Sequence, residues 1–150
     1  MKIAALLRST ALVMTMAIGL SVQGSAAEPG KDFKSPVLNR AQVDALLSKP
    51  DGVVVIDLRR PDEQQAGAFP VFLSIQADDL EKYLAYIPRD RQILTVSNHY
   101  GRSGKAADLL ASKGFKVAGV VGAEYYQQQG GRLNKVLPPK PDPAKPASKS

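Results

Sequence analysis

The sequence feature that most constrains the fold is a buried strand that passes through a short polar loop into a helix. Residues 93–96 (ILTV) are apolar or β-branched and predict a strand. From Ser103 onward, alanines and leucines recur at helical spacing. A tight strand-to-helix loop directs its N–H groups inward, toward the positive end of the helix dipole. Residues 97–102 (SNHYGR) therefore predict an anion-binding loop.

The remaining segments predict alternating strands and helices. Such alternation is typical of an α/β fold with a mainly parallel central sheet flanked by helices. Continuous β-branched runs indicate strands that are covered on both faces. The predicted strands are 53–56, a short one at 71–73, 93–96 and 117–121. The predicted helices are one capped by Asn39 and Gln42, one from Asp78 or Asp79 to Tyr86, one at 103–113 ended by Gly114, and a short one at 124–129.

These segments resemble, in order and spacing, the rhodanese (sulfurtransferase) domain family over roughly residues 37–132. The first match is 54–59 (VVIDLR), followed by Pro61 and Glu63. Residues 67–70 (GAFP) stand where the family has Gly-His-Ile-Pro, and 120–123 (VVGA) where it has a strand and Gly-Gly. The 97–102 loop stands at the family's active-site loop. The resemblance implies a rhodanese-like three-layer domain.

The family's loop begins with a cysteine that carries a persulfide, whereas this chain has Ser97 there and contains no cysteine. An alcohol is hardly ionised at neutral pH, so Ser97 is either a nucleophile that needs a base or a polar floor to the pocket. We predict no catalytic residue, with Ser97 as the degenerate nucleophile position. The predicted anion- or ligand-binding residues are Ser97, Asn98, His99, Tyr100, Gly101 and Arg102.

Other polar residues near the loop have structural alternatives. Arg102 is expected either to brace the loop or to contact an anion. His99 is the only histidine, so we expect a solvent-exposed residue and neither a metal site nor a cofactor. Near the first strand, charged side chains are expected to form a bracing network: Asp57, Arg59 and Glu63. Tyr100, Tyr125 and Tyr126 are interpreted as lining the pocket mouth, or as core residues with an outward hydroxyl.

The two ends of the chain differ in composition from its centre. Lys2 and Arg8, an apolar run at 11–22 and small residues at 25–27 predict a signal peptide over 1–27. We expect a flexible lead-in at 28–36, a rhodanese-like domain at 37–133 and a disordered tail rich in proline and lysine at 134–150. The mature protein is then periplasmic or secreted, with no stable membrane anchor after cleavage.

Charge argues against nucleic acid as a partner. The net charge of +6 comes from the two ends, because 13 basic and 13 acidic residues balance between positions 28 and 131. A duplex-binding domain concentrates basic residues on its folded surface, so we do not expect nucleic acid to be a partner.

From the loop and the missing cysteine together, we predict a non-catalytic module that binds a small anion or a periplasmic protein. The alternatives are a sulfurtransferase-class enzyme working without a thiol, and a partner subunit of a sulfur or redox system.

Overall fold

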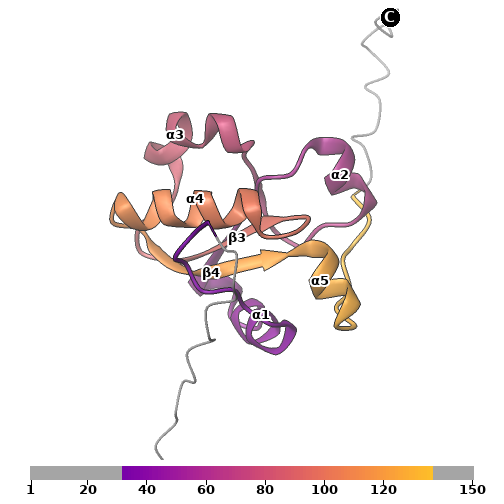
Figure 1. Ribbon diagram of the computed structural model, residues 1–150. Coiled ribbons are helices and arrows are strands. Elements are labelled where there is room, and N and C mark those ends of the chain that lie inside the picture. Colours follow the sequence, from indigo (N-terminus) through magenta and orange to yellow (C-terminus); the bar gives the residue numbers. More distant parts are fainter. Residues whose placement is uncertain (1–31, 137–150) are drawn as a thin grey trace, which may run out of the picture.

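The computed structural model describes residues 32–136, and its strands form one parallel sheet (Figure 1). The predicted signal peptide and most of the predicted tail lie outside the described residues. The sheet has the order β2-β1-β3-β4, so that β3 is central. The strands are β1 (Val53–Asp57), β2 (Leu73–Ser74), β3 (Gln92–Ser97) and β4 (Lys116–Gly122). The predicted α/β class with a parallel sheet is confirmed.

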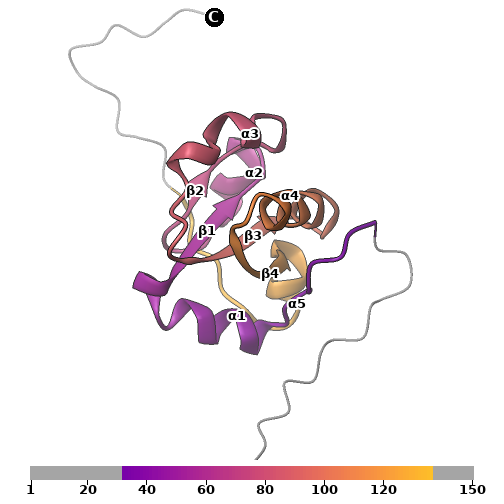
Figure 2. The same cartoon turned by 90° about the vertical axis from the view of Figure 1, so that its left-hand side faces the viewer.

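Helices cover both faces of the sheet and complete a three-layer arrangement (Figures 1 and 2). One face carries α1 (Arg40–Leu47) and α5 (Ala123–Gln128), and the other carries α3 (Leu80–Tyr83) and α4 (Gly101–Ser112). A further helix, α2 (Pro61–Ala66), follows the carboxyl end of β1. Short 3-10 turns lie at η1 (Pro50–Gly52), η2 (Ala77–Asp79) and η3 (Leu84–Tyr86).

The alternation of side chains along β1 explains why the sheet needs two covers. All five residues of β1 are buried. Val54 and Ile56 pack in the cluster that includes Leu110 of α4, whereas Val53 and Val55 pack in the cluster that includes Val43 of α1. Successive side chains of a strand point to opposite faces, so an uninterrupted β-branched run requires an apolar layer on each side.

Several predicted elements need correction. The helix α2 was not predicted, because Pro61 was interpreted as part of a turn, although proline at the first helical position is favourable. The short strand occupies Leu73–Ser74 rather than 71–73. The helix expected to end at Tyr86 is split into α3 and η3. Helix α4 begins at Gly101, so the last two residues of the predicted loop form its first turn.

The helix caps follow the prediction in part. Asn39 caps α1 in a capping box, in which its side chain accepts from Gln42 N–H (3.0 Å) and Gln42 Oε1 accepts from Asn39 N–H (2.9 Å). Asp79 precedes α3 without capping it, because its carboxylate pairs with Lys82 at 2.6 Å. Gly114, with φ of +82°, follows the end of α4 as expected.

Contacts with the domain extend beyond its predicted boundaries at both ends. Asp108 of α4 accepts from Lys34 N–H (2.7 Å), Ser35 N–H (2.8 Å) and Ser35 Oγ (2.6 Å). Burial raises the pKa of Asp108, but these hydrogen bonds outweigh that effect and lower it. Near the other end, Asn134 forms an antiparallel bridge with Ala68. Part of the predicted lead-in and the first residue of the predicted tail thus belong to the folded unit.

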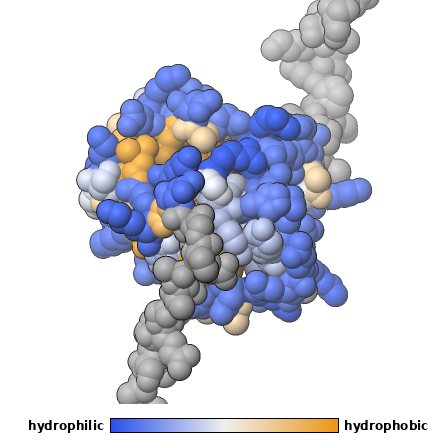
Figure 3. Space-filling model, in the orientation of Figure 1, coloured by the Kyte–Doolittle hydropathy of each residue, from blue (hydrophilic) through white to orange (hydrophobic). Residues whose placement is uncertain are grey.

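One face of the domain is largely hydrophilic (Figure 3). A hydrophobic patch interrupts it where α3 and α4 lie together, and Leu84 and Leu109 are partly buried against the same core cluster. Across residues 32–136, none of the helices has the length and apolar character needed to span a bilayer.

The contact between Phe33 and α4 yields a test. A Cβ added at Gly104 would overlap the Phe33 ring, whereas one added at Gly101 would meet nothing within 4 Å. We expect Gly104→Ala to expel Phe33 and to speed hydrogen exchange at the Lys34 and Ser35 amides by at least about tenfold. The matched variant Gly101→Ala should leave that exchange unchanged, because it makes the same chemical change in the same helical turn. Equal protection in both variants would contradict the packing described.

Candidate functional site

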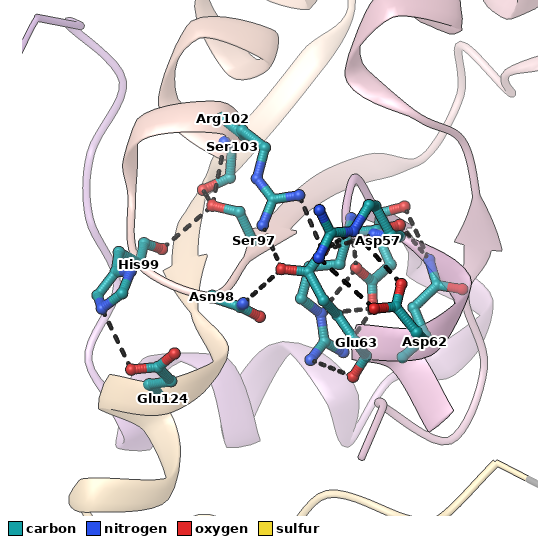
Figure 4. Close-up of polar contacts among 12 residues, drawn as sticks. Asp57, Asp62, Glu63, Ser97, Asn98, His99, Arg102, Ser103 and Glu124 are labelled. Carbon is teal, nitrogen blue, oxygen red and sulfur yellow. Dashed lines mark hydrogen bonds and ion pairs between the residues drawn. The ribbon is translucent and has the colours of Figure 1, made fainter. Parts of the chain in front are cut away.

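Ser97 lies at the end of β3, and its hydroxyl is used entirely within the chain (Figure 4). The residue is 1% exposed. Its Oγ lies 2.8 Å from Ser103 Oγ and 3.2 Å from the His99 carbonyl oxygen, and it accepts from Ser103 N–H at 3.2 Å. Three hydrogen bonds saturate the ordinary capacity of a hydroxyl group. Ser97 therefore joins β3 to the first turn of α4 as a buried structural link.

Histidine is not placed to activate Ser97. It is the carbonyl of His99 that contacts Ser97, whereas the imidazole Nε2 lies 3.1 Å from Glu124 Oε2. The His99 side chain is 62% exposed, as the sequence predicted. A serine nucleophile requires a base within hydrogen-bond reach of its hydroxyl. Among the described residues the groups in reach are another serine, a carbonyl and an amide, none of which is a base.

Glu63 is the centre of a network that fixes the loop. Its carboxylate accepts from Arg102 Nη1 (3.0 Å) and Nη2 (2.9 Å) in a bidentate pair, and from Asn98 Nδ2 at 2.6 Å. It also accepts from the Arg60 N–H at 2.7 Å, which places it at the start of α2. The chain at 60–63 is thereby tied to both ends of the 97–102 loop.

Electrostatics follow from this arrangement. The hydrogen bond from Arg102 is the main reason why the pKa of Glu63 falls from its ordinary 4.5 to about 2, and burial opposes the shift. The same contact raises the pKa of Arg102. Arg102 braces the loop through Glu63 rather than through the loop's own carbonyls, because both of its terminal nitrogens donate to that carboxylate.

Asp57 and Arg59 form a second, separate ion pair. Asp57 is fully buried, and its Oδ2 lies 2.7 Å from Arg59 Nη2. Arg59 also donates to the carbonyls of Glu63 (3.3 Å) and Gly67 (2.7 Å), so it fixes the segment that leaves β1. The bracing predicted for Asp57 and Arg59 is present, but the predicted network is divided: Arg59 reaches only the main-chain carbonyl of Glu63, whose carboxylate pairs with Arg102 instead.

The aromatic residues near the loop divide into a rim and a core. Tyr100 stacks on Tyr125 at 4.6 Å between ring centroids, and His99 meets Tyr125 edge-on at 5.5 Å. Tyr126 instead packs against Phe69 in the core and donates to Asp44 at 2.6 Å. Burial, with help from that hydrogen bond, raises the pKa of Tyr126 to about 12. Tyr126 thus follows the predicted alternative of a core residue, whereas Tyr125 belongs to the rim.

A glycine permits the close approach between the loop and β4. A Cβ at Gly122 would lie 2.7 Å from the His99 carbonyl oxygen and 3.1 Å from that of Asn98. Glu124 N–H donates to the Asn98 carbonyl at 3.0 Å and completes the contact. Ala123, which replaces the second glycine of the family pattern, is 1% exposed and packs in the core.

The structure brings all six predicted site residues to the carboxyl end of the central strand, but it uses them unequally. Ser97, Asn98 and Arg102 are committed to contacts within the chain, whereas Gly101 is exposed at the first turn of α4. Two contributors were missed. Ser103 was predicted only as a helix start, and Glu63 only as a bracing residue at the strand end. An arginine in a polar loop that requires a carboxylate partner was the signal that could have located Glu63. Within residues 32–136, no group of three or more metal-ligating side chains comes together.

Solved structures provide the comparison for this geometry. No protein-family model and no curated protein sequence matches the chain. A rhodanese-related protein from Thermoplasma volcanium superposes with a TM-score of 0.59 at 22% identity, covering 67% of this chain and 98% of that chain. A rhodanese-like domain protein from Staphylococcus aureus gives a TM-score of 0.52 at 21% identity, covering 57% and 84%.

The described residues have the fold of a rhodanese-like domain. A thiosulfate sulfurtransferase from Pseudomonas aeruginosa also matches, with a TM-score of 0.55 at 27% identity over 67% of this chain, which spans 20% of that enzyme's length. The rhodanese-like domain described here contains no cysteine, and its loop is closed by hydroxyl, amide and ion-pair contacts instead.

The Glu63 network predicts a specific loss of stability. Glu63→Gln removes the charge that pairs with Arg102 and should lower the free energy of unfolding by about 2 kcal/mol. The loss is smaller than for a fully buried pair, because the partly exposed Arg102 can be hydrated instead. Urea unfolding measures the change. Asp62→Asn is the matched control, because Asp62 is 71% exposed and should change stability by less than about 0.5 kcal/mol.

The same pair predicts a pH dependence with a definite sign. Because the pKa of Glu63 is lower in the folded state, its stabilising contribution is complete above about pH 5 and is lost as the pH falls toward 2. The stability difference between the wild type and Glu63→Gln should therefore shrink over that window. A difference that stays constant down to pH 2 would show that the ion pair does not stabilise the loop.

Proposed function

We propose that this rhodanese-like domain is a non-catalytic binding module and that the 97–102 loop forms its recognition surface. The observation that carries the proposal is the engagement of Ser97: its hydroxyl is buried, saturated and out of reach of any base among the described residues. A chain without cysteine also offers no group that holds a persulfide. What the fold retains is a rigid loop with exposed side chains around it.

A protein partner is the ligand class that the exposed groups favour. Asn98 and Arg102 are occupied by Glu63. The side chains that reach the surface around the loop are the exposed pair of His99 and Glu124 and the half-buried, stacked rings of Tyr100 and Tyr125. Rigid aromatic side chains with adjacent polar groups are typical of protein interfaces. This ligand is most consistent with the role of a partner subunit in a sulfur or redox system.

A small anion is the second candidate ligand. The first N–H groups of a helix have no intrahelical acceptor, and those of Gly101 and Arg102 begin the twelve-residue α4. Ser103 N–H already donates to the Ser97 hydroxyl. An anionic atom at the position of that hydroxyl would accept the same hydrogen bond. The predicted anion site is therefore retained as a proposal beside the protein partner.

Sulfur transfer distinguishes a binding module from an enzyme. Wild-type protein should show no thiosulfate:cyanide sulfur transfer, because it has no thiol. In Ser97→Cys the new sulfur would face the Ser103 N–H and hydroxyl at the start of α4, so its pKa should fall below the ordinary 8.5. Thiolate absorbance measured across pH reports the pKa, and Ser112→Cys, exposed at the other end of α4, should stay at or above about 8.5.

Turnover by the wild type would overturn the non-catalytic proposal and restore the sulfurtransferase alternative. An ordinary pKa in Ser97→Cys would remove the support for an anion-binding loop and leave the protein-partner proposal standing. The two readouts thus separate the enzyme from the module and one ligand class from the other.

We propose further that the module acts outside the cytoplasm. The support is in the sequence: the basic residues, apolar run and small residues of the first 27 positions match the pattern of an export signal. Expression with a C-terminal tag should give a periplasmic product whose N-terminal sequence begins near Glu28. An intact Met1 terminus, or retention in the membrane fraction, would contradict export with cleavage.

A further inference from the structure

A groove follows the open half of β1, at the opposite end of the sheet from the 97–102 loop. Strand β2 pairs with β1 only at Ile56 and Asp57. Before this point, β1 has β3 on one side and a groove of about 440 Å³ on the other. The groove is lined by Val53, Val54 and Val55 together with apolar residues from three other segments, among them Leu47, Phe72 and Tyr86.

The edge of β1 offers backbone hydrogen-bonding groups to this groove. Leu58 N–H donates to Val96 on the β3 side, and Ile75 N–H donates to Asp57 on the β2 side. Because successive residues of a strand direct their backbone groups to opposite sides, Val53 and Val55 face the groove side. Val53 N–H is already bound to the Pro50 carbonyl. The Val53 carbonyl and the Val55 N–H have no strand opposite them among residues 32–136.

A parallel strand can bond both groups through a single residue, in the direction that β2 already has beside β1. In a parallel pair, one residue of the incoming strand donates its N–H to residue i−1 and accepts from the N–H of residue i+1. A residue placed opposite Val54 would bond both free groups of β1 in this way. Val71 would occupy that position if β2 continued in register, but it is 76% exposed because the chain turns away before Leu73.

The groove walls are apolar and open to solvent. Four large apolar residues are exposed within the described part of the chain, and three of them line this groove: Val71 (76%), Leu73 (40%) and Tyr86 (79%). Exposed apolar side chains beside an unpaired strand edge are the two features of β-augmentation, in which backbone bonds give affinity and pockets select side chains.

Charge further defines the occupant. Asp51 and Arg91 both line the groove, and neither forms an ion pair within residues 32–136. Both lie at the end of the sheet where β1 and β3 begin, since Val53 is in register with Gln92. A complementary strand therefore carries one basic and one acidic residue at its amino end, ahead of apolar residues at alternate positions.

We propose that this groove is a second recognition site, which binds an extended segment of a partner protein as a parallel strand against Val53–Val55. The chain's own residues 137–150 fit the groove poorly. Prolines recur among them and lack the N–H that the Val53 carbonyl would accept. Their three lysines also outnumber their one acidic residue. A folded copy of the chain would have to present a free strand of the same polarity.

The test uses the purified protein and a synthetic peptide, acetyl-Glu-Lys-Val-Thr-Val-Thr-Val-amide, followed by amide NMR shifts. We expect shifts centred on Val53–Val55 and β2, and not on the 97–102 loop. Val71→Asp should lower the affinity for the peptide at least about tenfold, because it places a charge in the apolar wall of the groove. Ala41→Asp, an exposed position on α1 outside the groove, should leave binding unchanged.

N-methylation of the peptide tests the backbone pairing itself. Methylating the residue opposite Val54 should weaken binding at least about tenfold, while methylating either neighbour should change it by less than about threefold. Four results would overturn the proposal: no shift at β1, equal tolerance of N-methylation at every position, peptide binding that appears only after deletion of residues 137–150, or a concentration-dependent dimer that Val71→Asp dissociates.

Discussion

The bidentate pair between Glu63 and Arg102 is the interaction on which the candidate site depends. It joins two loops that leave the carboxyl ends of neighbouring strands, and Asn98 shares the same carboxylate. The buried pair of Asp57 and Arg59 fixes the first of these loops, because Arg59 also donates to the Glu63 and Gly67 carbonyls. The carboxylates of Asp57 and Glu63 are each paired with a guanidinium group, so these charges hold the two loops in place. A ligand therefore meets a surface whose shape is already fixed.

The hydroxyl at position 97 is part of the structure that holds the loop. Its oxygen bonds both Ser103 and the His99 carbonyl, so it is not available as a free polar group. An alcohol keeps its proton at neutral pH. The rhodanese-like fold thus has, at position 97, a buried hydroxyl that hydrogen-bonds β3 to the first turn of α4.

Much of this fold was predictable from the apolar runs in the sequence. The long strands, such as Val53–Asp57, are buried on both faces of the sheet, and a continuous run of β-branched residues indicates such burial. Helix α2 and the two-residue β2 were not predictable in the same way. Their boundaries depend on tertiary contacts, such as Arg59 with the Gly67 carbonyl, rather than on local propensity. The loop residues were predicted from their place between strand and helix. Their partners were not, since Glu63 lies 39 positions from Arg102 and nothing local joins them.

The contacts of residues 33–35 with α4 affect the order in which the domain is completed during synthesis. This segment leaves the ribosome before any strand, yet its acceptor Asp108 follows 73 and 74 positions later. Val37 likewise waits for Val120, and β1 acquires its central neighbour only when β3 has been made. Contacts of such long sequence separation form late, because the intervening chain must first be closed into a loop. The contacts that complete the domain therefore cannot all form until synthesis has passed Val120.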